Sequence, residues 1–200
     1  MEWKLCYAPN ERCGDREFLT VDALLQSGYD CIPARVPGNF ELDLMAAQKE
    51  HDLFWSTDTL RAQQWETTHV WYFTTFDAAD DQYLHFDGID TVADIILNGR
   101  VVRRVENMFL EYDVDEPLLP TGNQLIVHIR PAVLEARRRP LPACCSALTY
   151  GLEGLYIRKA PHMYGWDIMP RIVSCGLWRP VRLCTRRPDA IAEAFLYTRR

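Results

Sequence analysis

The chain has 200 residues, of which 48% are hydrophobic and 25% are charged, and its formal net charge is −6. Six Trp, nine Tyr and eight Phe require a packed core, which excludes a disordered chain. Glycine and proline follow no period and apolar residues form no heptad run, so collagen and coiled coils are excluded as well. We therefore expect a single globular domain over residues 1–200.

Short runs of β-branched and aromatic residues dominate the chain and predict strands. In chain order, the expected strands are residues 3–7, 70–76, 83–86, 92–97, 101–105, 111–114, 125–129 and 178–184. Asn98 and Gly99 separate two of these runs and predict a hairpin turn, because a two-residue type I′ turn needs positive φ at both positions. Pro180 should place the last strand at a sheet edge or at a bulge.

Two windows have weak helical character. The better one is 40–49, with Asn39 as its N-cap, and the other is 132–139, which Pro140 ends. Many short strands with little helix are typical of an all-β sandwich. The stretch 131–160 is a long connection with little pattern, and connections of this kind often form part of a functional rim.

Charge is divided unevenly along the chain. Residues 1–100 hold 7 basic and 18 acidic residues, a net charge of −11, whereas residues 101–200 hold 15 basic and 10 acidic residues, a net charge of +5. A basic half can bind nucleic acid, but the basic residues are scattered and only 137–139 form a cluster. We expect the two halves to attract each other within one fold, and we expect no nucleic-acid partner.

The cysteines predict no zinc site, because no two of them have the spacing of a C-x-x-C pair. There are seven, namely Cys6, Cys13, Cys31, Cys144, Cys145, Cys175 and Cys184. We expect buried, reduced thiols, which favour a reducing compartment. The first residues have no basic and apolar leader pattern, so a cytoplasmic location is expected unless a signal peptide has been removed. No run of about 18 apolar residues predicts a membrane span.

Common catalytic motifs are absent from the sequence, including the phosphate-binding loop, the nucleophile elbow and the H-E-x-x-H metal site. His85 and His128 fall within expected strands, where we interpret them as packing or surface residues rather than ligands. We therefore expect no catalytic residue, no metal and no cofactor in this chain.

Residues 156–171 concentrate aromatic and charged residues without either regular period. Within them, Trp166 stands beside Asp167. An indole can stack on the apolar face of a sugar ring while a carboxylate accepts hydrogen bonds from its hydroxyls, so the pair is a candidate sugar site. From these residues alone, a packed aromatic loop with a capped Asp is the favoured interpretation, and the sugar site is the alternative.

Five stretches, in this order, resemble the N-terminal sugar-binding domain of glycoside hydrolase family 2, the β-mannosidase branch above all. One is similar to the family's F-x-G-[LV]-D-T-x-A-x-[VI]-x-L-N-G strand pair, and the last is similar to its R-K-x-x-x-x-x-G-W-D-W-G-P-R block. The five stretches are residues 36–38, 86–99, 106–109, 119–125 and 158–181. Together the likeness covers residues 36–183.

The resemblance implies a jelly-roll β-sandwich of two antiparallel sheets, of the galactose-binding-like type. It also implies a catalytic TIM barrel beyond the C-terminus, which in the family carries both catalytic glutamates. This chain would then be the non-catalytic part of a β-mannosidase-like or β-galactosidase-like glycosidase. It would complete the subsite for the terminal sugar of a β-glycoside.

Three positions match the family's sugar-contacting residues. The resemblance assigns Asp167 as the acceptor for a sugar hydroxyl, Trp166 as a wall of the subsite and Asn98 as a second polar contact. The hairpin turn explains Asn98 equally well without a ligand. The basic residues of the same block would either orient Asp167 or pair with acids of the first half; they are Arg158, Lys159 and Arg171.

Ile168 and Met169 depart from the family pattern, since they replace its second Trp and the following Gly. This change should reshape the pocket, so the sequence leaves the sugar open. Two alternatives to the glycosidase domain also stay open. One is a free-standing lectin-like carbohydrate-binding module, and the other is a structural or dimerisation domain, which would allow a homo-oligomer.

Overall fold

The computed structural model describes residues 1–14, 16–140, 151–187, 189, 191 and 193–199. The strands are β1 (Trp3–Pro9), β2 (Asp30–Ala34), β3 (Thr68–Phe76), β4 (Gln82–Phe86), β5 (Ala93–Leu97), β6 (Arg100–Val105), β7 (Tyr112–Val114), β8 (Asn123–Ile129) and β9 (Val181–Thr185). The α-helices are α1 (Asn10–Cys13), α2 (Val21–Leu25), α3 (Phe40–Ala46) and α4 (Ala132–Arg137). Short 3-10 helices are η1 (Asp58–Trp65), η3 (Leu152–Leu155) and η4 (Pro161–Tyr164).

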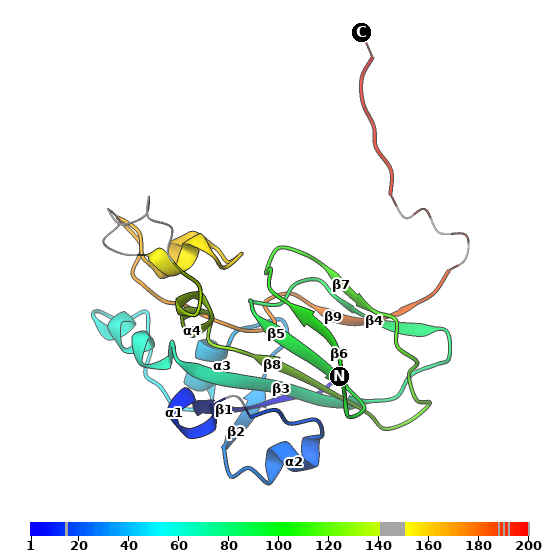
Figure 1. Ribbon diagram of the computed structural model, residues 1–200, viewed down its shortest axis with the longest axis horizontal. Coiled ribbons are helices and arrows are strands. Elements are labelled where there is room, and N and C mark those ends of the chain that lie inside the picture. The colour runs from blue at the N-terminus through cyan, green and yellow to red at the C-terminus, as the bar shows by residue number, and fades with distance from the viewer. Residues whose placement is uncertain (15, 141–150, 188, 190, 192, 200) are drawn as a thin grey trace.

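Two antiparallel sheets form the body of the molecule (Figure 1). Within the described residues, six strands make the large sheet in the order β2-β1-β3-β8-β5-β6, and three make the small sheet in the order β7-β4-β9. The expectation of a sandwich of two antiparallel sheets is confirmed. All eight expected strands form, and β9 lies at a sheet edge directly after Pro180, as predicted.

The sequence analysis missed β2, and the structure explains why. The strand contains Pro33 and pairs only with β1, and of its side chains only that of Ile32 is buried. An edge strand of this kind has neither a continuous apolar run nor a clean alternation, so the pattern that predicts a strand is absent.

The central strands of the large sheet, β3, β8 and β5, are buried on both faces. On β3, Val70 and Tyr72 point into the core between the sheets. Trp71 and Phe73 point to the opposite face, where Leu24 of α2 covers them. This double burial accounts for the unbroken apolar run of β3, which a half-exposed strand would not show.

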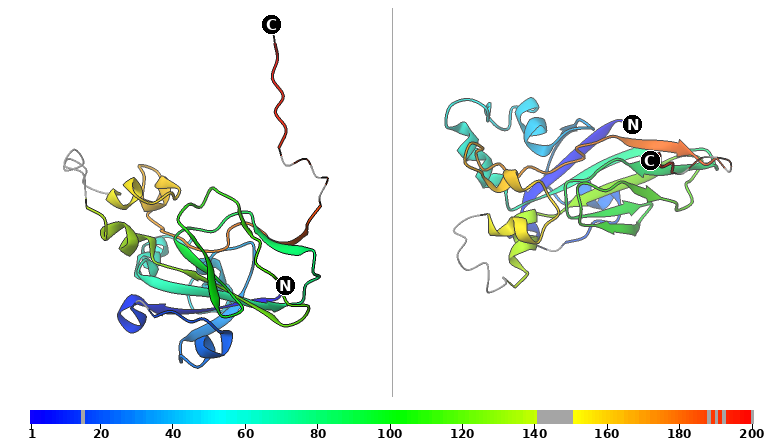
Figure 2. Two further views of the ribbon diagram at one scale, coloured as in Figure 1. Left: turned by 45° about the vertical axis from the view of Figure 1, so that its right-hand side comes forward. Right: turned by 90° about the horizontal axis from the view of Figure 1, so that it is seen from above.

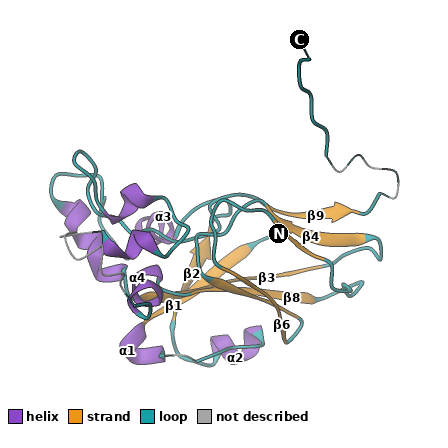
Figure 3. Cartoon of the chain, turned by 45° about the horizontal axis from the view of Figure 1, so that its top comes forward, coloured by secondary structure: helices purple, strands orange, loops and turns teal. Residues whose placement is uncertain are grey.

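Helix α3 begins as predicted, since the Asn39 side chain accepts a hydrogen bond from the Leu42 backbone N–H at 2.9 Å. It ends at Ala46 instead of Lys49, because the chain reverses at Gln48, where φ is +55°. Most helical residues gather with α3 at one end of the sandwich, while α2 lies against the large sheet (Figure 3).

The expectation that the cysteines are all reduced is wrong, because Cys6 and Cys31 form a disulfide. The two residues stand opposite each other in the β1–β2 pair, with their Cα atoms 4.0 Å apart. The pairing register brings them together, and it could not be inferred without β2. Cys175 and Cys184 carry no disulfide, and Cys144 and Cys145 lie outside the described residues.

The halves of opposite charge attract each other across the fold, as expected. Ion pairs join Glu66 to Arg171, Asp90 to Lys159 and Asp87 to Arg182. The basic cluster at 137–139 is also paired, with Glu153, Glu135 and Glu106 in turn. No helix in the described part of the chain is long and apolar enough to cross a membrane.

Candidate functional site

The segment of residues 151–171, yellow to orange in Figure 2, lies at the end of the sandwich where the helices gather. A tight turn in this segment presents Trp166 and Asp167. Helix η4 ends at Gly165, whose φ of +101° redirects the chain. Trp166 and Met169 then exchange two backbone hydrogen bonds of 3.1 Å, which leaves Asp167 at the tip. The Trp166 side chain is 66% exposed and Asp167 is exposed, so both face solvent and can reach a ligand.

Arg171 anchors the base of this turn. Its guanidinium donates from two nitrogens to the two carboxylate oxygens of Glu66, each at 2.7 Å, and it contacts Glu153 at 3.3 Å. A third nitrogen donates to the Tyr164 carbonyl at 3.3 Å. The hydrogen bonds that Arg171 donates to Glu66 raise the pKa of Arg171. The turn is therefore fixed to the first half of the chain by a bidentate ion pair.

A buried ion pair closes the loop of residues 160–173 at its two ends. The Lys159 ammonium donates to both oxygens of Asp90 at 2.5 Å, and it also donates to the Ser174 carbonyl. Lys159 stands where the chain enters the loop, and Ser174 stands where it leaves. The side chains of Lys159 and Asp90 are almost completely buried, so solvent does not screen the pair.

Two buried acids of α3 lie beneath the loop. The Ser174 hydroxyl donates to Glu41 at 2.6 Å, and burial raises the pKa of Glu41 to about 7. Asp43 accepts a hydrogen bond from the Arg35 backbone N–H at 2.9 Å, and burial raises its pKa to about 6. Helix α3 thus contributes polar support to the site as well as apolar residues to the core.

Exposed apolar side chains surround the turn. Phe54 is 73% exposed, Trp55 72% and Ile168 85%. A cavity of about 170 Å³ opens beside them, with the Glu41–Ser174 pair among its walls. Its lining residues are Asn39, Glu41, Leu42, Met45, Leu53, Phe54, Ile172 and Ser174. This end of the molecule therefore combines apolar surface with a free carboxylate.

Asn98 directly follows the last residue of β5, and its side chain has a structural role. Asn98 and Gly99 have φ values of +49° and +83°, so the predicted hairpin turn is present. The Asn98 side chain accepts from the Gln124 N–H at 2.8 Å and donates to Asn123 at 3.0 Å. The first residue of β5, Ala93, pairs with Ile129, the last residue of β8 before the chain continues to α4. Asn98 is therefore at the end of β5 that is far from α4. The structure brings Trp166 and Asp167 together but places Asn98 away from them.

The geometry also shows which acids two basic residues of the site block meet. Lys159 and Arg171 pair with Asp90 and Glu66 of the first half, so they position the loop instead of orienting Asp167 directly. The sequence analysis missed the buried Glu41. The available signal was a pair of acids, two residues apart, on a short helix with a strongly apolar face.

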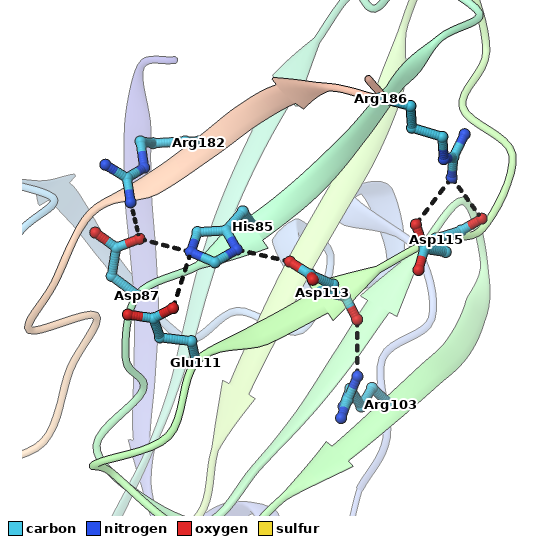
Figure 4. A network of polar contacts seen from close by, with 8 residues as sticks. All are labelled: His85, Asp87, Arg103, Glu111, Asp113, Asp115, Arg182 and Arg186. Carbon is cyan, nitrogen blue, oxygen red and sulfur yellow. Dashed lines mark hydrogen bonds and ion pairs between the residues drawn. The ribbon is translucent and has the colours of Figure 1, made fainter. Parts of the chain in front are cut away.

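His85 and His128 each contact other titratable side chains. His85 bonds Asp113 at 2.6 Å through Nδ1 and Asp87 at 3.0 Å through Nε2, which links neighbouring strands of the small sheet (Figure 4). His128 is buried against His69 at 2.9 Å, and its burial lowers its pKa well below the usual value. Among the described residues, no group of three His, Cys, Asp or Glu side chains is arranged to hold a metal ion.

The two-sheet sandwich with a loop-built end is the architecture of galactose-binding-like domains. Residues 19–179 match the family described as glycosyl hydrolase 2 galactose-binding domain-like, and the chain belongs to that family. The resemblance inferred from the sequence motifs is thereby confirmed, together with the galactose-binding-like fold.

Several relatives are beta-mannosidases. Beta-mannosidase B of Thermothelomyces thermophilus is 31% identical over 164 residues, which cover 75% of this chain and 19% of that protein. Beta-mannosidase B of Aspergillus fumigatus is 34% identical over 178 residues, or 83% of this chain and 21% of that protein. This chain thus spans about a fifth of the length of the curated relatives it matches.

Solved structures show the same fold. A crystal structure of beta-D-mannosidase from Dictyoglomus thermophilum superposes with a TM-score of 0.71 at 26% identity, over 92% of this chain and 22% of that one. The exo-chitosanase CsxA of Amycolatopsis orientalis has a TM-score of 0.60 at 18% identity, over 91% of this chain and 20% of that one. The second likeness concerns the fold alone.

Proposed function

We propose that this chain is the N-terminal sugar-binding domain of a β-mannosidase-like glycoside hydrolase, and that it completes the subsite for the terminal sugar of a β-glycoside. Hydrolysis itself belongs to a catalytic barrel later in the polypeptide. In such an enzyme a pair of carboxylates carries out the two steps of a retaining mechanism. The role of this chain is to bind and orient the sugar.

The observation that carries the proposal is the exposed Trp166–Asp167 pair on an anchored turn. The Trp166 ring offers a flat apolar face, and the Asp167 carboxylate can accept hydrogen bonds from sugar hydroxyls. Because Arg171 and Lys159 fix the base of the loop, the pair needs little ordering when a sugar binds. Asn98 is left out of the proposed subsite, since its side chain is occupied in the hairpin.

The surface around the turn supports a partner that covers it. Phe54, Trp55 and Ile168 expose most of their side chains at the same end as the proposed subsite. Two residues supply only part of a sugar site, so the remaining walls must come from elsewhere. We propose that the catalytic barrel packs against this end and supplies them.

The test measures hydrolysis of p-nitrophenyl β-mannoside by the full-length protein. Asp167→Asn removes a charged acceptor and should lower kcat/KM by about tenfold to a hundredfold, the range for one charge-assisted hydrogen bond. Trp166→Ala should lower it to a similar degree. Asn98→Gly, which keeps the positive φ of the hairpin, is the control and should stay close to the parent. Unchanged kcat/KM in Asp167→Asn would refute the proposed subsite.

The size of the native polypeptide is the measurement to make first. An immunoblot of source-cell lysate against this domain should detect a band several hundred residues longer than the chain, because a barrel must follow. A band at the size of 200 residues would contradict the glycosidase proposal and leave a lectin-like module as the better interpretation.

A further inference from the structure

A groove lies between the free edges of the two sheets, at β6 of the large sheet and β7 of the small sheet. It encloses about 500 Å³ and continues to residues 156–158. Among the described residues, its lining includes four arginines, Arg103, Arg104, Arg139 and Arg158. Neither Trp166 nor Asp167 lines it. The groove is therefore separate from the subsite proposed above.

The groove has more arginine side chains than carboxylates among its lining residues, although the net charge of the whole chain is −6. One carboxylate lines the groove, that of Glu106, and it already accepts from Arg139 at 2.8 Å. Arg104 lies 3.2 Å from Asp94 and 3.6 Å from Glu17. The Arg158 side chain forms no ion pair or hydrogen bond within the described ranges, and it is exposed. An anion entering the groove would meet a guanidinium that no described side chain pairs with.

The walls of the groove are held in place before any ligand arrives. Arg139 donates to the Tyr156 carbonyl at 3.3 Å, and the Met108 N–H donates to the Arg158 carbonyl at 3.0 Å. Arg103 lies over the Tyr112 ring at 5.2 Å. In Figure 4 the same Arg103 side chain reaches across to Asp113 of β7, where it donates to the backbone carbonyl at 2.8 Å. These bonds join the two sheet edges and limit the ordering cost of binding.

The remaining groups in the groove suit a sugar better than a bare ion. The Asn107 amide oxygen accepts from the Phe109 N–H at 3.0 Å, which leaves the amide nitrogen as a donor. The Glu106 carboxylate can accept from hydroxyl groups, and Leu110, which is 53% exposed, offers apolar surface to a ring. A planar guanidinium is matched to a carboxylate by two parallel hydrogen bonds.

We propose that this groove binds a carboxylate-bearing sugar, a hexuronate. Its carboxylate pairs with Arg158 and Arg104, and its hydroxyls bond Asn107 and Glu106. The site goes beyond the proposed function, because it recognises an acidic sugar at a place that the terminal-sugar subsite does not use. A cavity of this size is within the usual range of about 300–1,000 Å³ for ligand pockets.

The experiment titrates the full-length protein with sodium D-glucuronate, D-glucose and sodium sulfate, each at the same ionic strength, and follows binding by calorimetry. Glucuronate should bind, and glucose, which lacks the carboxylate, should bind at least about tenfold more weakly. Sulfate should also be weaker, since it has no hydroxyls for Asn107 and Glu106. Sulfate binding as tight as glucuronate would overturn the sugar assignment in favour of a general anion site.

Variants locate the binding. Arg158→Gln should weaken glucuronate binding about tenfold, as expected for the loss of one charge-assisted contact, and it should leave the melting temperature unchanged because the side chain is exposed. Arg100→Gln is the matched control, because Arg100 is an exposed arginine of β6, the strand that carries Arg103 and Arg104, but does not line the groove. Asp167→Asn should retain glucuronate binding. The proposal would be refuted if Asp167→Asn lost glucuronate binding or if Arg158→Gln had no effect on it. A further titration uses a poly-glutamate peptide, and tighter binding of this peptide than of glucuronate would also refute the proposal.

Discussion

Glu41 makes folding sensitive to pH, because burial raises its pKa to about 7 from an ordinary value of 4.5. The folded state holds this proton more tightly than the unfolded state. Its contribution to stability is therefore complete below about pH 4.5 and is lost as the pH rises through about 7. A glutamine can still accept from Ser174 and cannot ionise.

We predict that Glu41→Gln reduces this loss of stability by an amount on the order of 3 kcal/mol between pH 4.5 and pH 8, measured by urea unfolding. Glu111→Gln alters an acid whose side chain is 62% exposed and is the control. Parallel curves for the parent and Glu41→Gln would show that Glu41 does not titrate in this range.

Lys159 and Asp90 form a buried ion pair, and removing either partner alone should destabilise the fold. Lys159→Met leaves the Asp90 carboxylate buried without its counter-charge, so the free energy of unfolding should fall by about 3–5 kcal/mol. Arg158→Met, at the exposed residue directly before Lys159, is the control. It should change the free energy of unfolding by less than about 0.5 kcal/mol. Equal effects of the two substitutions in guanidinium unfolding would contradict the role assigned to the pair.

The residue scale also shows where sequence reasoning stops. Trp166 and Asp167 could be selected because their chemistry suits a sugar, and both are exposed at one tip. From the sequence, Lys159 could equally orient Asp167 or pair with an acid of the first half. Only the fold shows that Asp90, 69 positions earlier, is the one it meets. Contacts of this kind depend on the three-dimensional path and leave no local pattern.

At the scale of elements, strands with apolar and β-branched runs were predictable, and marginal elements were not. Strands β3 and β8 bury nearly every side chain, so composition alone reveals them. The 3-10 helices are short and lack a clear period, and η1 buries only Ala62. Elements that contribute little to the core carry little of the pattern from which a prediction is made.

The edge pair β1–β2 depends on its disulfide. Cys6 and Cys31 are 25 positions apart, and a crosslink over a loop of this length stabilises a fold by about 3 kcal/mol. The double variant Cys6→Ser/Cys31→Ser should lose about that much in chemical unfolding, and dithiothreitol should lower the melting temperature of the parent but not that of the double variant. Cys184→Ser, in a half-buried position without a disulfide, is the control. No response of the parent to dithiothreitol would contradict this assignment.

The disulfide also bears on the compartment. The cytoplasmic location expected from the sequence depended partly on seven reduced thiols, and that support is removed by the Cys6–Cys31 bond. Disulfides persist mainly in oxidising compartments. We therefore propose an oxidising location, such as a periplasm or the extracellular space, for the protein that contains this chain.

For the molecule as a whole, the charge asymmetry of the sequence becomes attraction between the two halves. Lys159 and Arg171 in the second half each pair with an acid in the first half. The sequence predicted this attraction but could not say which residues meet. It predicted the sandwich for a similar reason, since the number and length of the strands define an architecture without defining its contacts.

The apolar end should make the isolated chain associate. We predict that the 200-residue chain alone forms dimers or larger species in analytical ultracentrifugation, because Phe54, Trp55 and Ile168 lack the cover that a barrel would supply. Phe54→Ser/Trp55→Ser should shift the chain toward monomer. Leu119→Ser, at an exposed position outside this cluster, should not. A chain that is monomeric at every concentration would argue against a docking surface at this end.

The loop of residues 160–173 leaves the sandwich and returns to it at one place, where Lys159 meets Asp90 and the Ser174 carbonyl. A second attachment lies inside the loop, where Arg171 pairs with Glu66. The exposed tip, residues 166–169, stands between these two attachments in the sequence. Ile168 and Met169 belong to this tip, and both are exposed. Substitutions at the tip would therefore change the surface that the loop presents to a ligand and leave both attachments intact.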